Sequence, residues 1–250
     1  MTSPYVKNIT RSGITTITFY TPDHNALPSN VLSKLEKEIR NAGLAEETRV
    51  IILKSGGDRT FCAGADFKEL LSIKNEAEGT QFFLGFAKVI LAMRNCEKLI
   101  IGRVQGKAVG GGVGLAAACD YCFATKYAAI KLSEISLGIG PFVIAPAVER
   151  KIGGTALAAL TLEPGSFHNA DWAVQKGLYN QVFDTAENMD AEVQKKSEEL
   201  SGLNPEALLA CKQIFWEETQ KWPELLKKRA EMSGRLVLSE FTKKALAKYK

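Results

Sequence analysis

Apolar residues recur at alternating positions between residues 5 and 20, on both sides of Ser12-Gly13. Such alternation is typical of half-buried strands, and a glycine-containing pair between two runs favours a tight turn. The segment is therefore predicted to form a two-stranded hairpin. Short apolar runs predict further, more deeply buried strands at 50–54, 99–105, 121–124 and 179–183, and an extended piece at 129–132.

A helical period of apolar residues follows the hairpin. Val31, Leu32, Leu35 and Ile39 share one face of a predicted helix over 29–41, with Ser29 as its cap and Gly43 at its end. Asp66 is predicted to cap the next helix. The further predicted helices cover 67–71, 76–95, 113–119, 145–151, 155–161 and 169–175.

From residue 186 to the C-terminus the pattern is almost entirely helical. Amphipathic helices are predicted at 187–202, 205–220 and 223–248, with Pro205 and Pro223 at helix starts. We therefore expect an α/β core over 1–185 and a helical region over 186–250. The apolar faces of that region fit two roles equally well, covering the core and forming an oligomer interface. In the core, strand–strand–helix units recur at 5–43, 50–72 and 100–119.

Composition adds broad limits. The chain has 250 residues, 46% of them hydrophobic and 24% charged, which is enough for one large core. The net charge of +4 is spread along the chain, so it does not argue for a nucleic-acid partner, and we expect none, but it suits a phosphate-bearing ligand. We expect no membrane span, no metal site and a cytoplasmic location with reduced cysteines, including the isolated pair Cys119 and Cys122.

Two glycine-containing turns carry the candidate chemistry. The stretch Phe61–Asp66 and the stretch Gly106–Asp120 each pass from an apolar run through glycine into a helix. A helix start leaves backbone N–H groups unpaired, and glycine lets a ligand atom approach them closely. Two such groups converging on one carbonyl oxygen would form an oxyanion hole. Each turn taken alone is better explained as a tight strand-to-helix connection.

Three motifs in this order, FCAGADFKEL (61–70), GKAVGGGVGLAAACD (106–120) and KLSEISLGI (131–139), resemble the crotonase, or enoyl-CoA hydratase/isomerase, superfamily. The similarity runs from Asn25 to Lys244. It implies an α/β spiral of strand–strand–helix units with a helical C-terminal tail. It also implies an acyl-CoA thioester ligand, with coenzyme A bound as part of the substrate, and a homotrimer or homohexamer.

The same resemblance implies roles for individual residues. The amides of Ala65 and Gly111 would bind the thioester oxygen, and Glu134 matches one catalytic glutamate. The tail residues Phe241 and Lys244 would contact coenzyme A, often from a neighbouring subunit. The other residues implied in substrate binding are Ala63, Gly64, Asp66, Phe67, Lys68, Gly110, Gly114 and Pro141.

The sequence departs from the family at two places. Gly114 stands where ordinary hydratases carry their first catalytic glutamate, and the segment after Gly138 lacks the usual glycine-rich run. Only Glu134 remains of the pair. Its neighbours Leu132 and Ile135 are apolar, so burial would raise its pKa toward neutrality, where it could move protons; a capping or surface glutamate is the alternative.

Three functions fit this pattern. The leading hypothesis is a hydratase of 2-enoyl-CoA, of a kind that resembles hydratases of branched or carboxylated substrates such as 3-methylglutaconyl-CoA. Arg150 could then pair with a substrate carboxylate, although an arginine on a helix surface is the favoured interpretation of this residue. The second is a Δ3,Δ2-enoyl-CoA isomerase, because one carboxylate suffices to move a proton from C2 to C4. The third is a non-catalytic acyl-CoA-binding protein. His24 and His168 are expected to be loop residues without a catalytic role.

Overall fold

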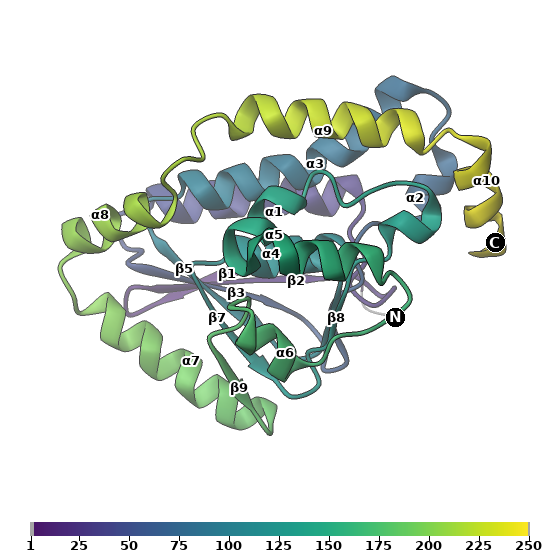
Figure 1. Ribbon diagram of the computed structural model, residues 1–250. Coiled ribbons are helices and arrows are strands. Elements are labelled where there is room, and N and C mark those ends of the chain that lie inside the picture. The colour runs from purple at the N-terminus through teal and green to yellow at the C-terminus, as the bar shows by residue number, and fades with distance from the viewer. Residues whose placement is uncertain (1–2, 250) are drawn as a thin grey trace.

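Two β-sheets organise the chain in the computed structural model, which describes residues 3–249 (Figure 1). Within those residues, one sheet has six strands in the order β1-β2-β3-β5-β7-β9, and the other has three in the order β4-β6-β8. The strands of the large sheet are β1 (Tyr5–Arg11), β2 (Ile14–Tyr20), β3 (Val50–Ser55), β5 (Leu99–Val104), β7 (Tyr121–Thr125) and β9 (Gln181–Phe183). Those of the small sheet are β4 (Thr60–Cys62), β6 (Lys107–Val109) and β8 (Ile130–Lys131).

The large sheet is parallel except at one edge. β1 pairs antiparallel with β2 through the predicted hairpin, whereas β2, β3, β5, β7 and β9 run parallel. Val50 of β3 lies opposite Ile14 on one side and Leu99 on the other. Most residues of β3 and β5 are buried, as near-continuous apolar runs in parallel strands covered on both faces should be.

The chain spirals by giving one strand to each sheet in turn. β3 and β4 precede helix α2 (Phe67–Ser72), β5 and β6 precede helix α4 (Gly111–Ala118), and β7 and β8 precede the 3₁₀ helix η1 (Glu134–Leu137). An isolated bridge between Leu27 and Ala65 continues the same arrangement beside the hairpin. These units confirm the predicted strand–strand–helix recurrence and add another at 121–137. The strands β4 and β6 lie in segments expected to be only turns.

The helices differ from the predictions mainly at their ends. The prediction that Ser29 caps α1 is wrong, because Pro28 occupies the N-cap position and Ser29 is the first residue of the helix. The amide of Ser29 donates a hydrogen bond to the carboxylate of Glu69 at 2.7 Å. The long helix predicted at 223–248 is interrupted at 237–239, and Ser239 caps its second part. The helices are α1 (Ser29–Leu44), α2 (Phe67–Ser72), α3 (Glu76–Asn95), α4 (Gly111–Ala118), α5 (Ala145–Leu162), α6 (Ala170–Gln175), α7 (Ala186–Ser201), α8 (Pro205–Phe215), α9 (Trp222–Leu236), α10 (Glu240–Leu246) and the 3₁₀ turn η2 (Ala247–Tyr249).

Two other predicted helix boundaries need correction. The helix predicted over 205–220 ends at Phe215, and the two predicted at 145–151 and 155–161 form one element, α5. Gly153 has non-helical φ and ψ of 75° and 161°, so α5 is kinked there and keeps the character of two segments. None of the helices in the described part of the chain has the length and hydropathy needed to cross a membrane.

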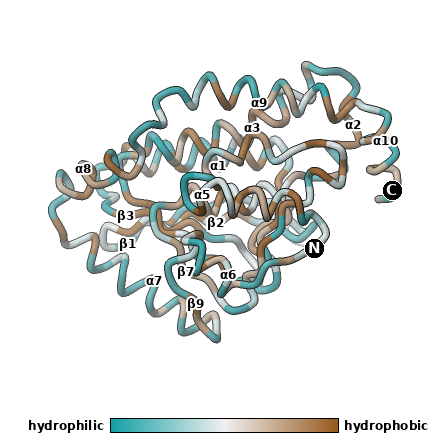
Figure 2. Tube along the Cα trace, in the orientation of Figure 1, coloured by the Kyte–Doolittle hydropathy of each residue, from teal (hydrophilic) through white to brown (hydrophobic). Residues whose placement is uncertain are grey.

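Helices cover both faces of the large sheet (Figure 1). The main core lies on the side of α1, α3 and α4, where apolar residues concentrate toward the interior (Figure 2). A smaller core lies on the other side, where Met189 and Val193 of α7 pack against Ile52, Ile101 and Phe123 of the sheet. Because α7 supplies the second apolar layer, part of the predicted helical region covers the core.

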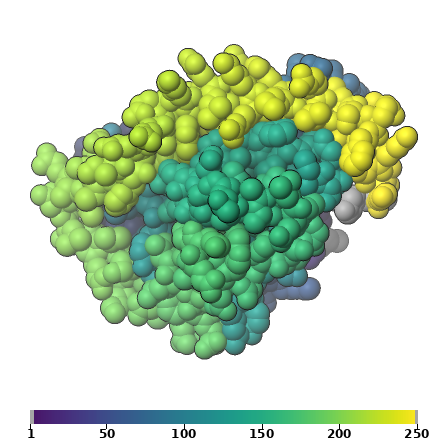
Figure 3. Space-filling view, viewed as in Figure 1, coloured from purple at the N-terminus to yellow at the C-terminus, as the bar shows by residue number. Residues whose placement is uncertain are grey.

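Helix α9 returns across α3 and closes the molecule on the side of the main core (Figures 1 and 3). The two helices approach most closely at a pair of glycines. A Cβ atom added to Gly79 would lie 2.8 Å from Cα of Gly234, and one added to Gly234 would lie 2.5 Å from the amide nitrogen of Thr80. Glycine is therefore required on both sides of this crossing.

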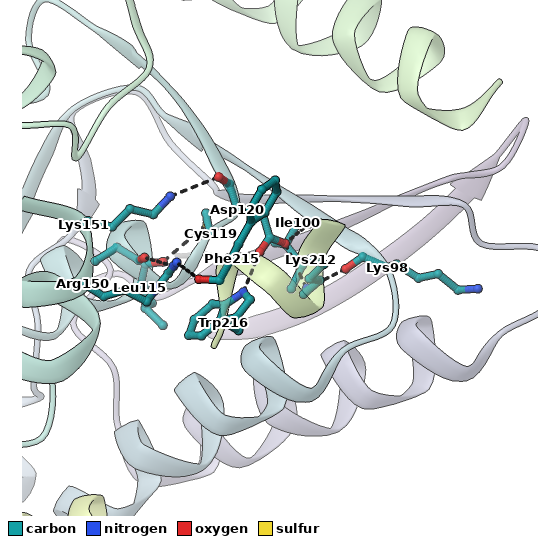
Figure 4. A network of polar contacts seen from close by, with 11 residues as sticks. Lys98, Ile100, Leu115, Cys119, Asp120, Arg150, Lys151, Lys212, Phe215 and Trp216 are labelled. Atoms are coloured by element: carbon teal, nitrogen blue, oxygen red, sulfur yellow. Dashed lines mark hydrogen bonds and ion pairs between the residues drawn. The ribbon is translucent and has the colours of Figure 1, made fainter. Parts of the chain in front are cut away.

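A buried polar network fixes α8 to the end of α4 (Figure 4). Nζ of Lys212 lies 2.9 Å from Oδ2 of Asp120, and both side chains are only 3% exposed. Asp120 also accepts hydrogen bonds from the indole of Trp216 at 2.8 Å and from the amide of Ile100 at 2.8 Å. These bonds compensate for burying the charges and attach the C-terminal helices to the core.

Candidate active site

A cavity of about 60 Å³ lies where the two glycine turns, η1, the segment 139–144, α3 and α9 meet. Its lining is mostly apolar, and among the described residues only Ser133, Glu134 and Ser233 contribute polar side chains to it. The lining residues are Ala63, Gly64, Ala65, Phe67, Leu70, Phe83, Phe86, Val109, Gly110, Gly111, Ser133, Glu134, Leu137, Ile139, Gly140, Pro141, Phe142, Val143, Ile144 and Ser233.

The two glycine turns converge on this cavity. Gly64 follows β4 with φ of +90°, and Gly110 follows β6 with φ of +52°. A Cβ atom on Gly64 would lie 2.9 Å from the carbonyl oxygen of Val109 and 3.4 Å from the amide nitrogen of Gly111. The positive φ values and this close approach explain why glycine occupies both positions. They also bring Ala65 and Gly111 to one wall of the cavity.

The amides of Ala65 and Gly111 are available to a ligand. Neither donates a hydrogen bond to another group within residues 3–249, although their neighbours Asp66 and Gly110 do. Gly111 is the first residue of α4, so its N–H lies at the positive end of the helix dipole. Two such donors can stabilise an oxygen that becomes negatively charged during a reaction.

Glu134 places its carboxyl group beside these amides. It is the first residue of η1, and its Oε1 would lie 2.8 Å from a Cβ atom added to Gly110. Its Oε2 is buried and has no hydrogen-bond partner among the described residues. Burial raises the pKa of Glu134 from 4.5 to about 7, and the backbone amides of Glu134 and Ser133 oppose this shift only in part.

Eight of the residues expected at the site line the cavity. They are Ala63, Gly64, Ala65, Phe67, Gly110, Gly111, Glu134 and Pro141. Asp66 lies just outside it and caps α2 by accepting a hydrogen bond from the amide of Glu69 at 2.8 Å, as predicted. Lys68 is exposed and pairs with Asp23 at 2.7 Å.

Gly114 is separated from the cavity by Ile144. A Cβ atom on Gly114 would lie 2.5 Å from Cγ2 and 2.7 Å from Cβ of Ile144, so no side chain fits there in this conformation. The tail residues of α10 are also outside the lining. Phe241 lies against Gly138, directly after η1 in the same chain, and Lys244 is exposed on the surface.

Arg150 is not among the residues that line the cavity, so the pairing with a substrate carboxylate that was considered for it is not supported. Its Nη1 donates to the carbonyl of Phe215 at 2.9 Å, and its guanidinium stacks 3.8 Å from the ring centre of Trp216. His24 lies in the turn before α1, and the His168 ring lies 3.3 Å from the carboxylate of Glu163 and packs at a tilt of 40° against Trp172. Neither histidine lines the cavity.

The sequence did not identify several cavity residues. Phe83 and Phe86 lie one helical turn apart on α3, and the ring of Phe86 comes within 2.2 Å of where a Cβ atom on Gly111 would be. The sequence predicted only the helix over 76–95 that carries them. Ser233 is 122 residues beyond Gly111 in the sequence, and only the crossing of α9 over α3 brings it to the cavity.

Comparison with known proteins identifies this fold. An enoyl-CoA hydratase structure from Bacillus halodurans matches with a TM-score of 0.90, at 21% identity, over 98% of this chain and 99% of that one. An enoyl-CoA hydratase/carnithine racemase structure from Magnetospirillum magneticum matches with a TM-score of 0.79, at 25% identity, over 84% and 79%. The architecture is therefore the α/β crotonase fold, as expected.

Sequence comparison gives the family. The chain belongs to the enoyl-CoA hydratase/isomerase family, whose profile matches residues 9–250. The short-chain-enoyl-CoA hydratase of Clostridium acetobutylicum is 31% identical over 166 residues, which cover 66% of this chain but only 63% of that protein. The carnitinyl-CoA dehydratase of Salmonella agona is 29% identical over 209 residues, covering 83% of this chain and 79% of that protein.

Proposed function

We propose that the protein is a Δ3,Δ2-enoyl-CoA isomerase that uses Glu134 as its only acid–base group. The observation that carries this proposal is that Glu134 is the one acidic side chain among the described residues lining the cavity. A pKa of about 7 suits a group that must both accept and donate a proton near neutral pH.

The proposed reaction transfers one proton between two carbon atoms. The Glu134 carboxylate removes a proton from C2 of a 3-enoyl thioester, and the electron pair moves into the carbonyl to give a dienolate. The amides of Ala65 and Gly111 hold the negatively charged oxygen, and one such donor typically contributes about 2.7–4 kcal/mol to lowering a barrier. The protonated Glu134 then returns the proton to C4, which moves the double bond to C2–C3 and regenerates the carboxylate.

The cavity favours a small, uncharged acyl group. No lysine, arginine or histidine is among the described residues that line it, so a carboxylate on the acyl chain would have no counter-charge. Because Arg150 is used elsewhere, the structure gives no support to 3-methylglutaconyl-CoA as the substrate. Coenzyme A would lie along the loop 61–68, with Lys68, Phe241 and Lys244 as candidate contacts for it.

Hydration is the second candidate function, favoured by the similarity to the Clostridium hydratase. Glu134 would then supply the proton at C2 while water adds at C3. This route needs a bound water opposite the carboxyl group. The proposed isomerase needs none, and for that reason it agrees better with the single acid of this cavity.

Mass spectrometry in ¹⁸O-labelled water separates the two functions. Short-chain 2-enoyl- and 3-enoyl-CoA are incubated with the protein, and the products are separated by chromatography before their masses are measured, because the two enoyl isomers have the same mass. The proposal predicts conversion of 3-enoyl-CoA into unlabelled 2-enoyl-CoA. A 3-hydroxyacyl-CoA that carries one ¹⁸O atom as the main product would show a hydratase, and binding without turnover would show the non-catalytic alternative.

A further inference from the structure

Ile144 occupies the space into which a side chain at position 114 would project. Cβ and Cγ2 of Ile144 lie 2.7 and 2.5 Å from the ideal Cβ position of Gly114, whereas its Cα lies 3.7 Å away. The first two separations are shorter than carbon atoms tolerate. The side chain of Ile144, and not its backbone, therefore closes this wall of the cavity.

The position of Ile144 is held firmly. It is 4% exposed and lies at the N-cap of α5, where its carbonyl accepts a hydrogen bond from Val148 at 3.1 Å. The next amide, that of Ala145, donates to the carbonyl of Pro141 at 2.8 Å. A β-branched side chain is also stiff at χ1, so Ile144 has little freedom to move aside.

The same wall is unsuited to a bound water. Val143 and Ile144 line the cavity next to each other, and both are hydrocarbon side chains. An ordered water in a protein interior needs two to four polar partners. In the described part of the chain, the polar side chains that line the cavity are those of Ser133, Glu134 and Ser233, and Val143 and Ile144 add no hydrogen-bond partner to them.

We propose that Ile144 is a specificity-determining residue that, by filling the space beside Gly114, excludes a nucleophilic water and restricts the enzyme to proton transfer. This inference rests on the proposed isomerase function. Ile144 limits the space beside the reacting atoms and transfers no proton itself. It determines whether the intermediate is protonated at C4 or water is added at C3.

The test compares ¹⁸O incorporation among variants. Ile144→Gly removes both clashing atoms, and glycine is tolerated at helix N-caps. In Gly114→Glu/Ile144→Gly, a glutamate can enter the cleared space and hold a water opposite Glu134. We expect this double variant to form ¹⁸O-labelled 3-hydroxyacyl-CoA at least tenfold faster than Gly114→Glu alone.

Two control variants distinguish the removal of the Ile144 contacts with residue 114 from a general loss of packing in this wall of the cavity. Val143→Gly, combined with Gly114→Glu, removes a neighbouring side chain of the same wall without clearing the two contacts, so no gain in ¹⁸O incorporation is expected. Gly114→Glu/Ile144→Ala keeps the Cβ atom at 2.7 Å and should gain less than the glycine version. This graded series, with folding checked by thermal denaturation, remains informative if one variant is unstable.

The possible results test the role of Ile144 separately from the proposed isomerase function. If the wild type isomerises without ¹⁸O uptake, but Gly114→Glu hydrates as well as its double variant with Ile144→Gly, the role of Ile144 is wrong and the isomerase stands. Folded double variants that isomerise but never hydrate would also overturn it. If the wild type itself hydrates, both proposals fail.

Discussion

The carboxyl group of Glu134 lies directly against Gly110. A Cβ atom at residue 110 would lie 2.8 Å from Oε1 and 3.3 Å from Cδ of Glu134. Gly110 immediately precedes the free amide of Gly111, so the missing side chain lets the acid–base group and the proposed oxyanion donor share one wall. The position of Glu134 thus depends on a glycine that itself takes no part in the chemistry.

Replacing Gly110 by alanine should therefore displace Glu134. The new methyl group would collide with the carboxyl group, and a misplacement of about 1 Å can cost about 10²-fold in rate. We expect kcat/KM for 3-enoyl-CoA to fall by about that factor. The matched control is Gly57→Ala, because Gly57 also has a positive φ, +78°, but its Cβ would meet nothing within 4 Å. Equal losses of activity in both variants would contradict this account.

The pH profile should report the ionisation of Glu134. Removal of a proton from C2 requires the carboxylate, and burial raises the pKa of Glu134 to about 7. We therefore expect kcat/KM for isomerisation to rise about tenfold per pH unit below pH 7 and to level off above it. Initial rates between pH 5 and 9 measure this directly. A profile that is flat down to pH 5 would mean that Glu134 has an ordinary pKa or is not the base.

The same ionisation should oppose folding. The pKa of Glu134 is higher in the folded protein than its ordinary 4.5, so the folded state holds its proton more tightly. Stability should fall as the pH rises from about 4.5 to about 7, by up to about 3 kcal/mol. Glu134→Gln removes the charge, and we expect it to unfold at a higher temperature than the wild type at pH 8 but not at pH 5. If the difference in unfolding temperature between Glu134→Gln and the wild type were the same at both pH values, burial of the charged carboxylate would not be what destabilises the wild type.

The buried pair Lys212–Asp120 should anchor the C-terminal helices. Lys212→Met would leave the Asp120 carboxylate buried without its counter-charge, a change that typically costs about 3–5 kcal/mol. Urea denaturation measures the loss. Lys243, which pairs with Glu240 at 3.3 Å on the surface, is the control, and Lys243→Met should cost less than about 1 kcal/mol. If the two variants lost similar amounts of unfolding free energy, the burial of the Lys212–Asp120 pair would contribute nothing to stability.

The local parts of this fold could be predicted from the sequence. Alternation around Ser12-Gly13 gave the hairpin β1–β2, and Asp66 was recognisable as a cap because its side chain acts within one helical turn. Three-residue strands such as β4 and β6 show too little periodicity to be recognised. The break between α9 and α10 carries no proline or glycine, so it was missed as well.

Only the site residues that lie within the three sequence motifs could be predicted. The motifs placed Ala65, Gly111 and Glu134 in one family pattern, but the approach of Gly64 to Gly111 is a property of the assembled sheets. Ser29 shows the same limit, because its amide is satisfied by a carboxylate from another helix rather than by its own side chain. Ile144 lay in the segment that departs from the family, where the pattern gave no indication of its contact with Gly114.

The most direct test of the central claim is the isomerisation rate of Glu134→Gln with 3-enoyl-CoA. The glutamine keeps the size of the side chain but cannot accept and return the proton. We predict that kcat falls by about 10²–10⁴-fold, while the Kd of a saturated short-chain acyl-CoA stays within about threefold of the wild-type value. A folded Glu134→Gln protein that isomerises 3-enoyl-CoA within tenfold of the wild type would contradict the role of Glu134 as the only acid–base group.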